Sequence, residues 1–264
     1  MIYRALIRKP HFQLLRRLAT QAATENEAFY VRYLTGSDAG IVQFHLNRPQ
    51  AKNAINADMV AGLRIAMDTV RYDRTCREVG PHVAKLRALM ESLADLPQPT
   101  IAAIDGYALG GGLEMALACD MRVVADSVRI GLTETKLAII PGAGGTQRLS
   151  RLVGASLAKE LIFTGRMIEG SLAYQMGLAN QCASQNKSGD AAYLAALDLA
   201  REILPNGPIA QRLAKTAIDR GLNVDLQNGL KLEELCYNQT ITTKDRVEGL
   251  RAFAEKRPPL YTGD

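Results

Sequence analysis

Residues 100–126 restrict the possible folds more than any other stretch of the sequence. Two short apolar runs rich in β-branched residues, TIAAIDG and MRVVAD, enclose the segment YALGGGLEMALACD. Strands buried in a parallel sheet have such continuous apolar sequences, and an apolar helix between them is typical of an α/β layout. Glycine lets a backbone approach another group closely because it has no Cβ. The stretch predicts a strand, a glycine turn and a buried helix with one acid, Glu114, in its first turn.

The rest of the chain alternates in a way that fits the same fold class. FYVRYL and GIVQFHLN, separated by TGSDAG, predict two strands around a turn. Apolar residues at helical spacing predict helices over 56–71 and 81–96, and six more after Gly154 over 155–164, 169–176, 190–203, 207–220, 225–239 and 243–256. A chain of 264 residues is long enough for one large domain with an appendage. We expect a core over 29–205 and a helical region over 206–264.

Composition excludes several classes of protein. Apolar residues make up 47% and charged residues 22%, and no run approaches the roughly 18 apolar residues that a membrane-spanning helix needs. The four cysteines have no CxxC spacing and no nearby histidines, so neither a zinc site nor a disulfide framework is expected; they are Cys76, Cys119, Cys182 and Cys236. No metal ligand set is indicated.

The net charge of +5 comes from the start of the chain. Residues 1–24 contain five basic residues and no acid, so the remainder balances at 27 basic against 27 acidic residues. An amphipathic, arginine-rich segment without acids is typical of a mitochondrial transit peptide. We predict that 1–28 is such a peptide, the alternative being a disordered basic arm. Because the remainder is neutral, the basic charge does not indicate nucleic-acid binding.

A second glycine cluster accompanies a second isolated acid. In GLTETKLAIIPGAGGTQRL, Glu134 precedes glycines at 142–145, and TQRL then begins a helix. Two acids among apolar residues and beside glycine turns suggest a pair of carboxyls for acid–base chemistry, since partial burial raises a carboxyl pKa toward neutrality. Two simpler interpretations remain open: acids favour first helical turns, and glycines at a helix start can cradle phosphate. Neither a P-loop order nor a dinucleotide motif is present.

These two stretches and the C-terminal TTKDRVEGLRAFAEKRPP resemble the enoyl-CoA hydratase/isomerase (crotonase) family over about 29–264. The likeness is greatest to its branch of mitochondrial methylglutaconyl-CoA hydratases. The resemblance implies a spiral core of ββα units and a helical C-terminal trimerisation region. It further implies a mitochondrial-matrix enzyme that hydrates acyl-CoA substrates as a homotrimer or dimer of trimers, with no cofactor.

The resemblance also implies roles for individual residues. Glu114 and Glu134 match the two acids that hold a water over the C2=C3 bond, and Gly111 matches a backbone donor to the thioester oxygen. Further positions are expected to contact substrate or coenzyme A: Lys52, Ala54, Gly110, Gly142, Phe253 and Lys256.

One region departs from the family pattern. Other members have an apolar strand and a loop with a second oxyanion donor after the helix corresponding to 56–71, whereas this chain reads VRYDRTCREVGPHV at 70–83. Roughly 25–30 residues, a core strand and its connection, are expected to be missing near 72–80. Impaired hydration is therefore expected. A double-bond isomerase and a non-catalytic subunit that binds coenzyme A or assembles with relatives remain alternatives; RNA binding is disfavoured because helix 56–71 has few basic residues.

Overall fold

The computed structural model describes residues 2–6, 29–39, 41–46, 60 and 82–264. Its larger sheet has the strand order β2-β3-β1-β4-β6-β9. These strands are β1 (Ile2–Leu6), β2 (Phe29–Tyr33), β3 (Ile41–Leu46), β4 (Thr100–Ile104), β6 (Met121–Ala125) and β9 (Gln181–Ala183). The two strands predicted at 29–34 and 40–47 are confirmed as β2 and β3, and the two apolar runs around the glycine segment are β4 and β6. A smaller sheet, β5-β7-β8, consists of Tyr107–Leu109, Arg129–Gly131 and Ile168–Glu169.

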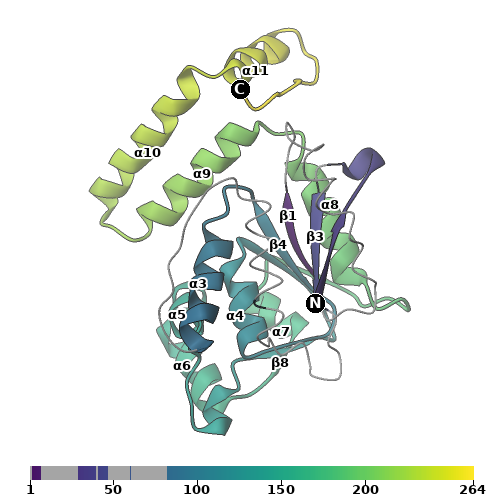
Figure 1. The fold of residues 1–264 in the computed structure, drawn as a ribbon, viewed down its shortest axis with the longest axis vertical. Coiled ribbons are helices and arrows are strands. Elements are labelled where there is room, and N and C mark those ends of the chain that lie inside the picture. Colours follow the sequence, from purple (N-terminus) through teal and green to yellow (C-terminus); the bar gives the residue numbers. More distant parts are fainter. Residues whose placement is uncertain (1, 7–28, 40, 47–59, 61–81) are drawn as a thin grey trace.

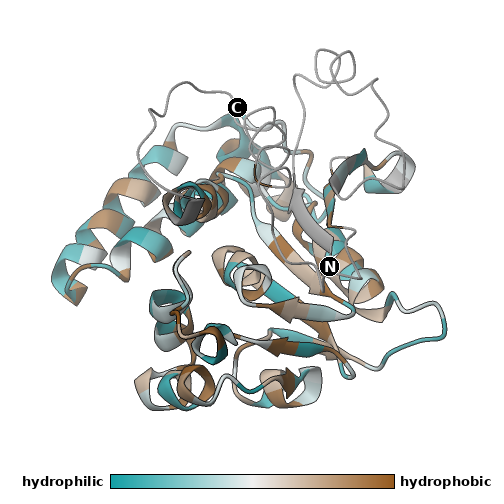
Figure 2. Ribbon diagram, turned by 60° about the horizontal axis from the view of Figure 1, so that its bottom comes forward, coloured by the Kyte–Doolittle hydropathy of each residue, from teal (hydrophilic) through white to brown (hydrophobic). Residues whose placement is uncertain are grey.

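Helices cover both faces of the larger sheet (Figure 1). Helix α8 (Ala191–Ile203) packs on β4, β6 and β9, and α4 (Gly111–Ala118) lies on the other side against α3 (His82–Ala94) and α5 (Gly145–Val153). Helices α6 (Ala155–Thr164) and α7 (Gly170–Gln175) complete this part. Every residue of β3 and β4 is buried, and α4 is buried from its second residue onward. Figure 2 shows the corresponding concentration of hydrophobic residues in the central strands.

The C-terminal region is a helical extension, as predicted for 206–264. It contains α9 (Pro208–Gly221), α10 (Leu226–Ile241) and α11 (Lys244–Ala254), and Figure 1 shows the α9–α10 hairpin projecting beyond the sheet. An ion pair connects α9 to the core, since Lys215 Nζ lies 2.9 Å from Asp120 Oδ2. The same oxygen accepts hydrogen bonds from the N–H and hydroxyl of Thr100 at the start of β4. The extension is thereby anchored to the core strand that leads to the glycine segment.

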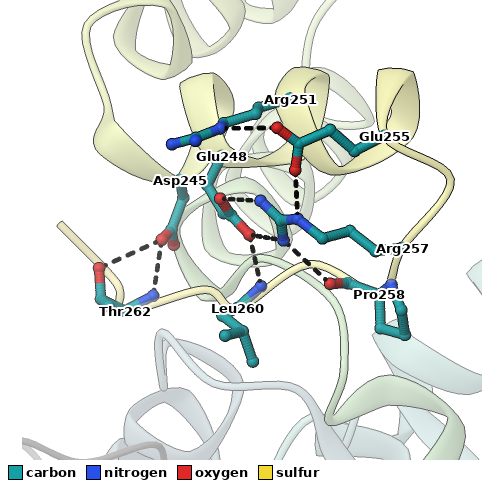
Figure 3. Close-up of polar contacts among 8 residues, drawn as sticks. All are labelled: Asp245, Glu248, Arg251, Glu255, Arg257, Pro258, Leu260 and Thr262. Carbon is teal, nitrogen blue, oxygen red and sulfur yellow. Dashed lines mark hydrogen bonds and ion pairs between the residues drawn. The ribbon is translucent and has the colours of Figure 1, made fainter.

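The end of the chain folds back onto α11 (Figure 3). Glu248 accepts two hydrogen bonds from the Arg257 guanidinium, at 2.6 and 2.9 Å, and a third from the N–H of Leu260. The Arg257 contact lowers the pKa of Glu248 to about 2. Asp245, which is buried, accepts the N–H groups of Thr262 and Gly263. These contacts hold the end of the chain against the first two turns of α11.

Strand β1 lies within the segment predicted to be a transit peptide or a disordered arm. Residues 1–28 are predicted to be a leader or a disordered arm, but Ile2–Leu6 lies in the sheet, antiparallel to both β3 and β4. The sequence also predicts that a core strand is lacking and that its neighbours must find other partners. Here β1 supplies these partners: five of its residues pair with β3 and four with β4. The helix expected over 56–71 and the junction at 72–80 lie outside the described residues, except for Val60.

Candidate active site

The two glycine clusters meet because each begins a helix at the same place in the core. Gly110 immediately precedes α4 and has φ 54°, and its N–H donates to Gly131 O of β7 at 2.9 Å. Gly144 immediately precedes α5 and has φ 109°. Both conformations lie in the region that L side chains rarely adopt, so glycine is required at these turns. The turns bring the N-terminal ends of α4 and α5 together.

Glu114 connects the two clusters. It lies in the first turn of α4 with only 3% of its surface exposed. Its Oε1 accepts the N–H groups of Ala143 and Gly145, each at 2.8 Å. Burial raises the pKa of Glu114, and these two amides, together with the charges of Arg148 and Arg87, offset part of the rise. One carboxyl oxygen is thus held firmly by the second glycine cluster.

Glu134 lies opposite, as the first residue of the short helix η3 (Glu134–Leu137). Its Oε2 is buried and has no hydrogen-bond partner in the part of the chain that the structure describes. Burial raises the pKa of Glu134, and the nearby negative charge of Glu114 raises it further. A buried polar oxygen without a partner is costly, so such an oxygen indicates a place where water or a ligand is bound.

Each acid packs against a glycine of the other acid's segment: Glu134 against Gly110, and Glu114 against Gly145. A Cβ added to Gly110 would lie 3.2 Å from Glu134 Oε1, and one added to Gly145 would lie 3.0 Å from Glu114 Oε1. Each carboxyl therefore occupies the space that a side chain on the other acid's segment would need. This arrangement explains why both acids come with bare glycines, and it joins the two predicted motifs into one site.

A backbone donor completes the group. Gly111 is the first residue of α4, so its N–H has no acceptor within the helix. No hydrogen bond to this N–H exists among the described residues. An amide at the N-terminal end of a helix is also on the positive side of the helix dipole. The group can therefore stabilise negative charge on an oxygen placed next to the carboxyl pair.

The structure brings together five of the predicted site residues: Glu114, Glu134, Gly110, Gly111 and Gly142. Phe253 and Lys256 are not near them in the single chain. They lie in the last turn of α11 and just beyond it, where Phe253 is 86% exposed, and Figure 1 shows α11 separated from α4 by α9. Lys52 and Ala54 lie outside the described residues.

Sequence reasoning missed the groups that hold the second glycine cluster. Arg87 of α3 donates to Gly142 O through Nε at 3.3 Å and Nη2 at 3.1 Å. Arg148 of α5 donates to Ala143 O through Nη1 at 3.1 Å. The only sequence signal was the position of Arg148, three residues after the last glycine of the cluster. Nothing in the sequence around Arg87 distinguishes it from an ordinary helix-surface arginine.

Across the described ranges, no three His, Cys, Asp or Glu side chains are grouped so that they could hold a metal ion. None of the helices described, which exclude most of 47–81, has the length and hydropathy to cross a bilayer.

Comparisons with known proteins identify similar chains. A model of the enoyl-CoA hydratase/isomerase family matches residues 82–264. A mouse protein named methylglutaconyl-CoA hydratase, mitochondrial, is 50% identical over 276 residues, covering 94% of this chain and 88% of the relative. A mouse protein named enoyl-CoA hydratase domain-containing protein 2, mitochondrial, is 47% identical, covering 96% of this chain and 94% of the relative.

A solved structure agrees with the fold. The crystal structure of enoyl-CoA hydratase from Bacillus anthracis superposes with a TM-score of 0.79 at 39% identity, covering 90% of this chain and all of that one. The crotonase-like fold predicted from the sequence is thereby confirmed. The alignment to the first mouse relative spans 276 residues, more than the 264 of this chain, so that relative contains residues without a counterpart here.

Proposed function

The chain belongs to the enoyl-CoA hydratase/isomerase family, and from this premise we propose that it adds water across the C2=C3 bond of an enoyl-CoA thioester. The observation that carries the proposal is the pair of carboxyls, Glu114 and Glu134, each packed against the other's glycine segment and lying beside the N–H of Gly111. A water between two carboxyls can lose a proton to one while the substrate receives a proton from the other.

The environments of the two acids support different roles. Glu114 Oε1 accepts two amide hydrogen bonds, which favour its ionised form, so it is suited to take a proton from water. Glu134 has a buried oxygen without a partner and faces the Glu114 charge, which favours its protonated form. In the proposed reaction the hydroxide adds to C3, Glu134 gives its proton to C2, and the thioester oxygen carries the developing charge. The N–H of Gly111 stabilises that oxygen.

Several finer points extend the proposal. The names of the mouse relatives support a mitochondrial location, which we place in the matrix, and the first supports methylglutaconyl-CoA or a short-chain enoyl-CoA as substrate. Coenzyme A is part of that substrate, and no cofactor takes part in the proposed chemistry. Because Phe253 and Lys256 lie far from the acids of their own chain, we propose that they contact the coenzyme A bound by a neighbouring subunit of a trimer. Lys52, Ala54, Gly110 and Gly142 are proposed to contact the same substrate.

The experiment is a hydration assay that follows loss of the ultraviolet absorbance of the conjugated enoyl thioester. We expect turnover by the unaltered chain and a reduction of at least about 100-fold in each of Glu114→Gln and Glu134→Gln. An exposed acid on α10, replaced in Glu233→Gln, is the matched control and should leave the rate unchanged. Full activity in either active-site variant would contradict the assignment.

The rate itself tests a second candidate function. Because the aligned relative is longer than this chain and the family's second oxyanion donor is lacking from the sequence at 70–83, we expect hydration at least about 100-fold slower than by a complete relative. A non-catalytic subunit would bind acyl-CoA with no turnover at all. Calorimetric titration with a saturated acyl-CoA, run beside the assay, distinguishes an impaired enzyme from a binding subunit. A rate equal to that of a complete relative would refute the predicted impairment.

A further inference from the structure

Both polar groups of the peptide unit between Gly142 and Ala143 make hydrogen bonds to charged side chains. Its N–H, contributed by Ala143, donates to Glu114 Oε1 at 2.8 Å, and its C=O, contributed by Gly142, accepts from Arg87 Nε and Nη2 at 3.3 and 3.1 Å. In a trans peptide the C=O and N–H point in opposite directions within one plane. Arg87 and Glu114 therefore bind opposite sides of the same amide, and the orientation of that amide depends on both.

The next peptide unit is held by a second arginine. Arg148 Nη1 donates to Ala143 O at 3.1 Å, and its guanidinium occupies the space that a Cβ on Gly144 would need. The N–H of Gly145, one residue further on, is the second donor to Glu114 Oε1. The glycine loop thus offers its amides to the carboxylate on one side and its carbonyls to two guanidinium groups on the other.

We propose that Arg87 and Arg148 are positioning residues: they hold the 142–145 loop so that its amides fix one oxygen of Glu114 and leave the other for the reacting water. This inference rests on the hydratase function proposed above. A carbonyl that accepts from a cation makes the N–H of its own peptide a better donor, because hydrogen bonds in a chain polarise one another. Neither arginine needs to touch the substrate for this role.

The charges around Glu114 come from three elements. Arg87 lies on α3, Arg148 on α5 and Glu134 on η3; the two arginines favour ionised Glu114, whereas ionised Glu134 opposes it. Glu91 of α3 faces Arg148 and counters part of its charge. Removing Arg87 therefore removes both a positive charge and an orienting contact. Ionisation of Glu114 should then require a higher pH.

The competing role for the two arginines is direct binding of the substrate. Both line a cavity of about 1000 Å³ that is also lined by Arg151 and Lys215. A guanidinium that bound an anionic part of the substrate there would mainly affect KM. A positioning residue mainly affects kcat, since misplacement of a reacting group by about 1 Å can cost up to 100-fold in rate. Arg151 is the matched control: it lies on α5 and lines the same cavity, but among the described residues it donates only to Gln147 of its own helix.

The experiment compares Arg87→Met, Arg87→Lys and Arg151→Met in the full chain. We expect Arg87→Met to lower kcat by about 10-fold or more, to leave KM within about twofold, and to move the acid limb of the kcat/KM profile to higher pH. Arg87→Lys should recover part of the rate because it restores the charge without the two-pronged contact. Arg151→Met should match the unaltered chain.

A second measurement does not depend on catalysis. Carboxyl ¹³C NMR with labelled glutamate, assigned by the signal lost in Glu114→Gln, reports the titration of Glu114 directly. We expect its pKa to rise in Arg87→Met and to stay unchanged in Arg151→Met. A raised pKa without any hydration by the unaltered chain would sink the proposed function and leave the positioning role intact. An unchanged Glu114 titration in Arg87→Met, or an effect confined to KM, would overturn the positioning role.

Discussion

Glycine at position 110 is needed both for the backbone conformation of the turn and for the position of the Glu134 carboxyl. Its φ of 54° suits only glycine, and an added Cβ would lie 3.2 Å from Glu134 Oε1. We expect Gly110→Ala to lower the free energy of unfolding by about 1–3 kcal/mol, because alanine is strained at this positive φ. It should also slow hydration about 10-fold or more, because the carboxyl is displaced. Chemical denaturation and the hydration assay measure the two effects separately.

Gly106, which precedes β5 whereas Gly110 follows it, provides the matched control. It has no positive φ, and a Cβ there would meet nothing within 4 Å. Gly106→Ala should therefore keep both stability and rate near those of the unaltered chain. If Gly110→Ala and Gly106→Ala behaved alike, the need for glycine at position 110 could not be attributed to its contact with the Glu134 carboxyl.

The raised pKa of Glu114 predicts how the stability of the folded protein changes with pH. Its folded-state pKa is raised above the ordinary value of 4.5 by burial, so the folded protein binds this proton more tightly than the unfolded chain does. The stabilisation from Glu114 is complete below the ordinary pKa and is lost as pH rises through the raised one. Glu114→Gln cannot ionise, so its Tm relative to the unaltered chain should increase from pH 4.5 to pH 8. Thermal unfolding at several pH values tests this, and a difference that stays constant or falls would count against a raised pKa.

At the scale of elements, β1 is the strand on which the sheet depends. Two strands that flank a third lie about twice 4.8 Å apart, too far to bond to each other. Without β1, the buried strands β3 and β4 would therefore have unpaired backbone groups. Arg4, which pairs with Gln43 and Ile101, is in the middle of β1. Arg4→Pro removes its N–H and should cost about 1–3 kcal/mol of stability.

Arg4→Ala separates backbone from side chain at the same position. It keeps the N–H, so it should leave β1 paired. Amide hydrogen exchange gives the local readout: in Arg4→Pro the amides of β4 should exchange faster, and in Arg4→Ala they should stay protected. Equal protection in both variants would mean that β1 does not support the sheet.

How far the sequence predicts the fold also depends on the element. Helix α6, Ala155–Thr164, begins and ends as predicted, because glycines at 154 and 165 bound a clear apolar periodicity. Strands β5 and β7 have three residues each and were not predicted, since their pairing is decided by tertiary contacts. Local sequence could not place β1 either, because its position is set by the space between β3 and β4. For the site, the acids were found from their glycines. The amides that hold Glu114 were not, because peptide orientation is a property of the folded loop.

At the scale of the whole molecule, β1 lies inside the segment predicted to be a transit peptide. Cleavage beyond Leu6 would remove a strand that pairs with two buried neighbours, whereas cleavage before Ile2 would not. The mature N-terminus and the stability of the sheet are therefore linked. A basic segment at the start of this chain can carry targeting information, but its first residues also have a structural role.

Assembly is the last property that belongs to the whole molecule. Apolar residues are exposed along α9–α11, including Leu226, which is 74% exposed at the start of α10. Exposed apolar surface of this kind marks an interaction site, and the hairpin projects beyond the core (Figure 1). We expect a solution mass of three or six times the 28.7 kDa of one chain, measured by light scattering. Leu226→Asp should shift it toward the single chain, whereas Gln227→Asp, with the same charge on the next exposed residue, should not. A single-chain mass for the unaltered protein would also remove the neighbouring subunit from which Phe253 and Lys256 are proposed to reach coenzyme A.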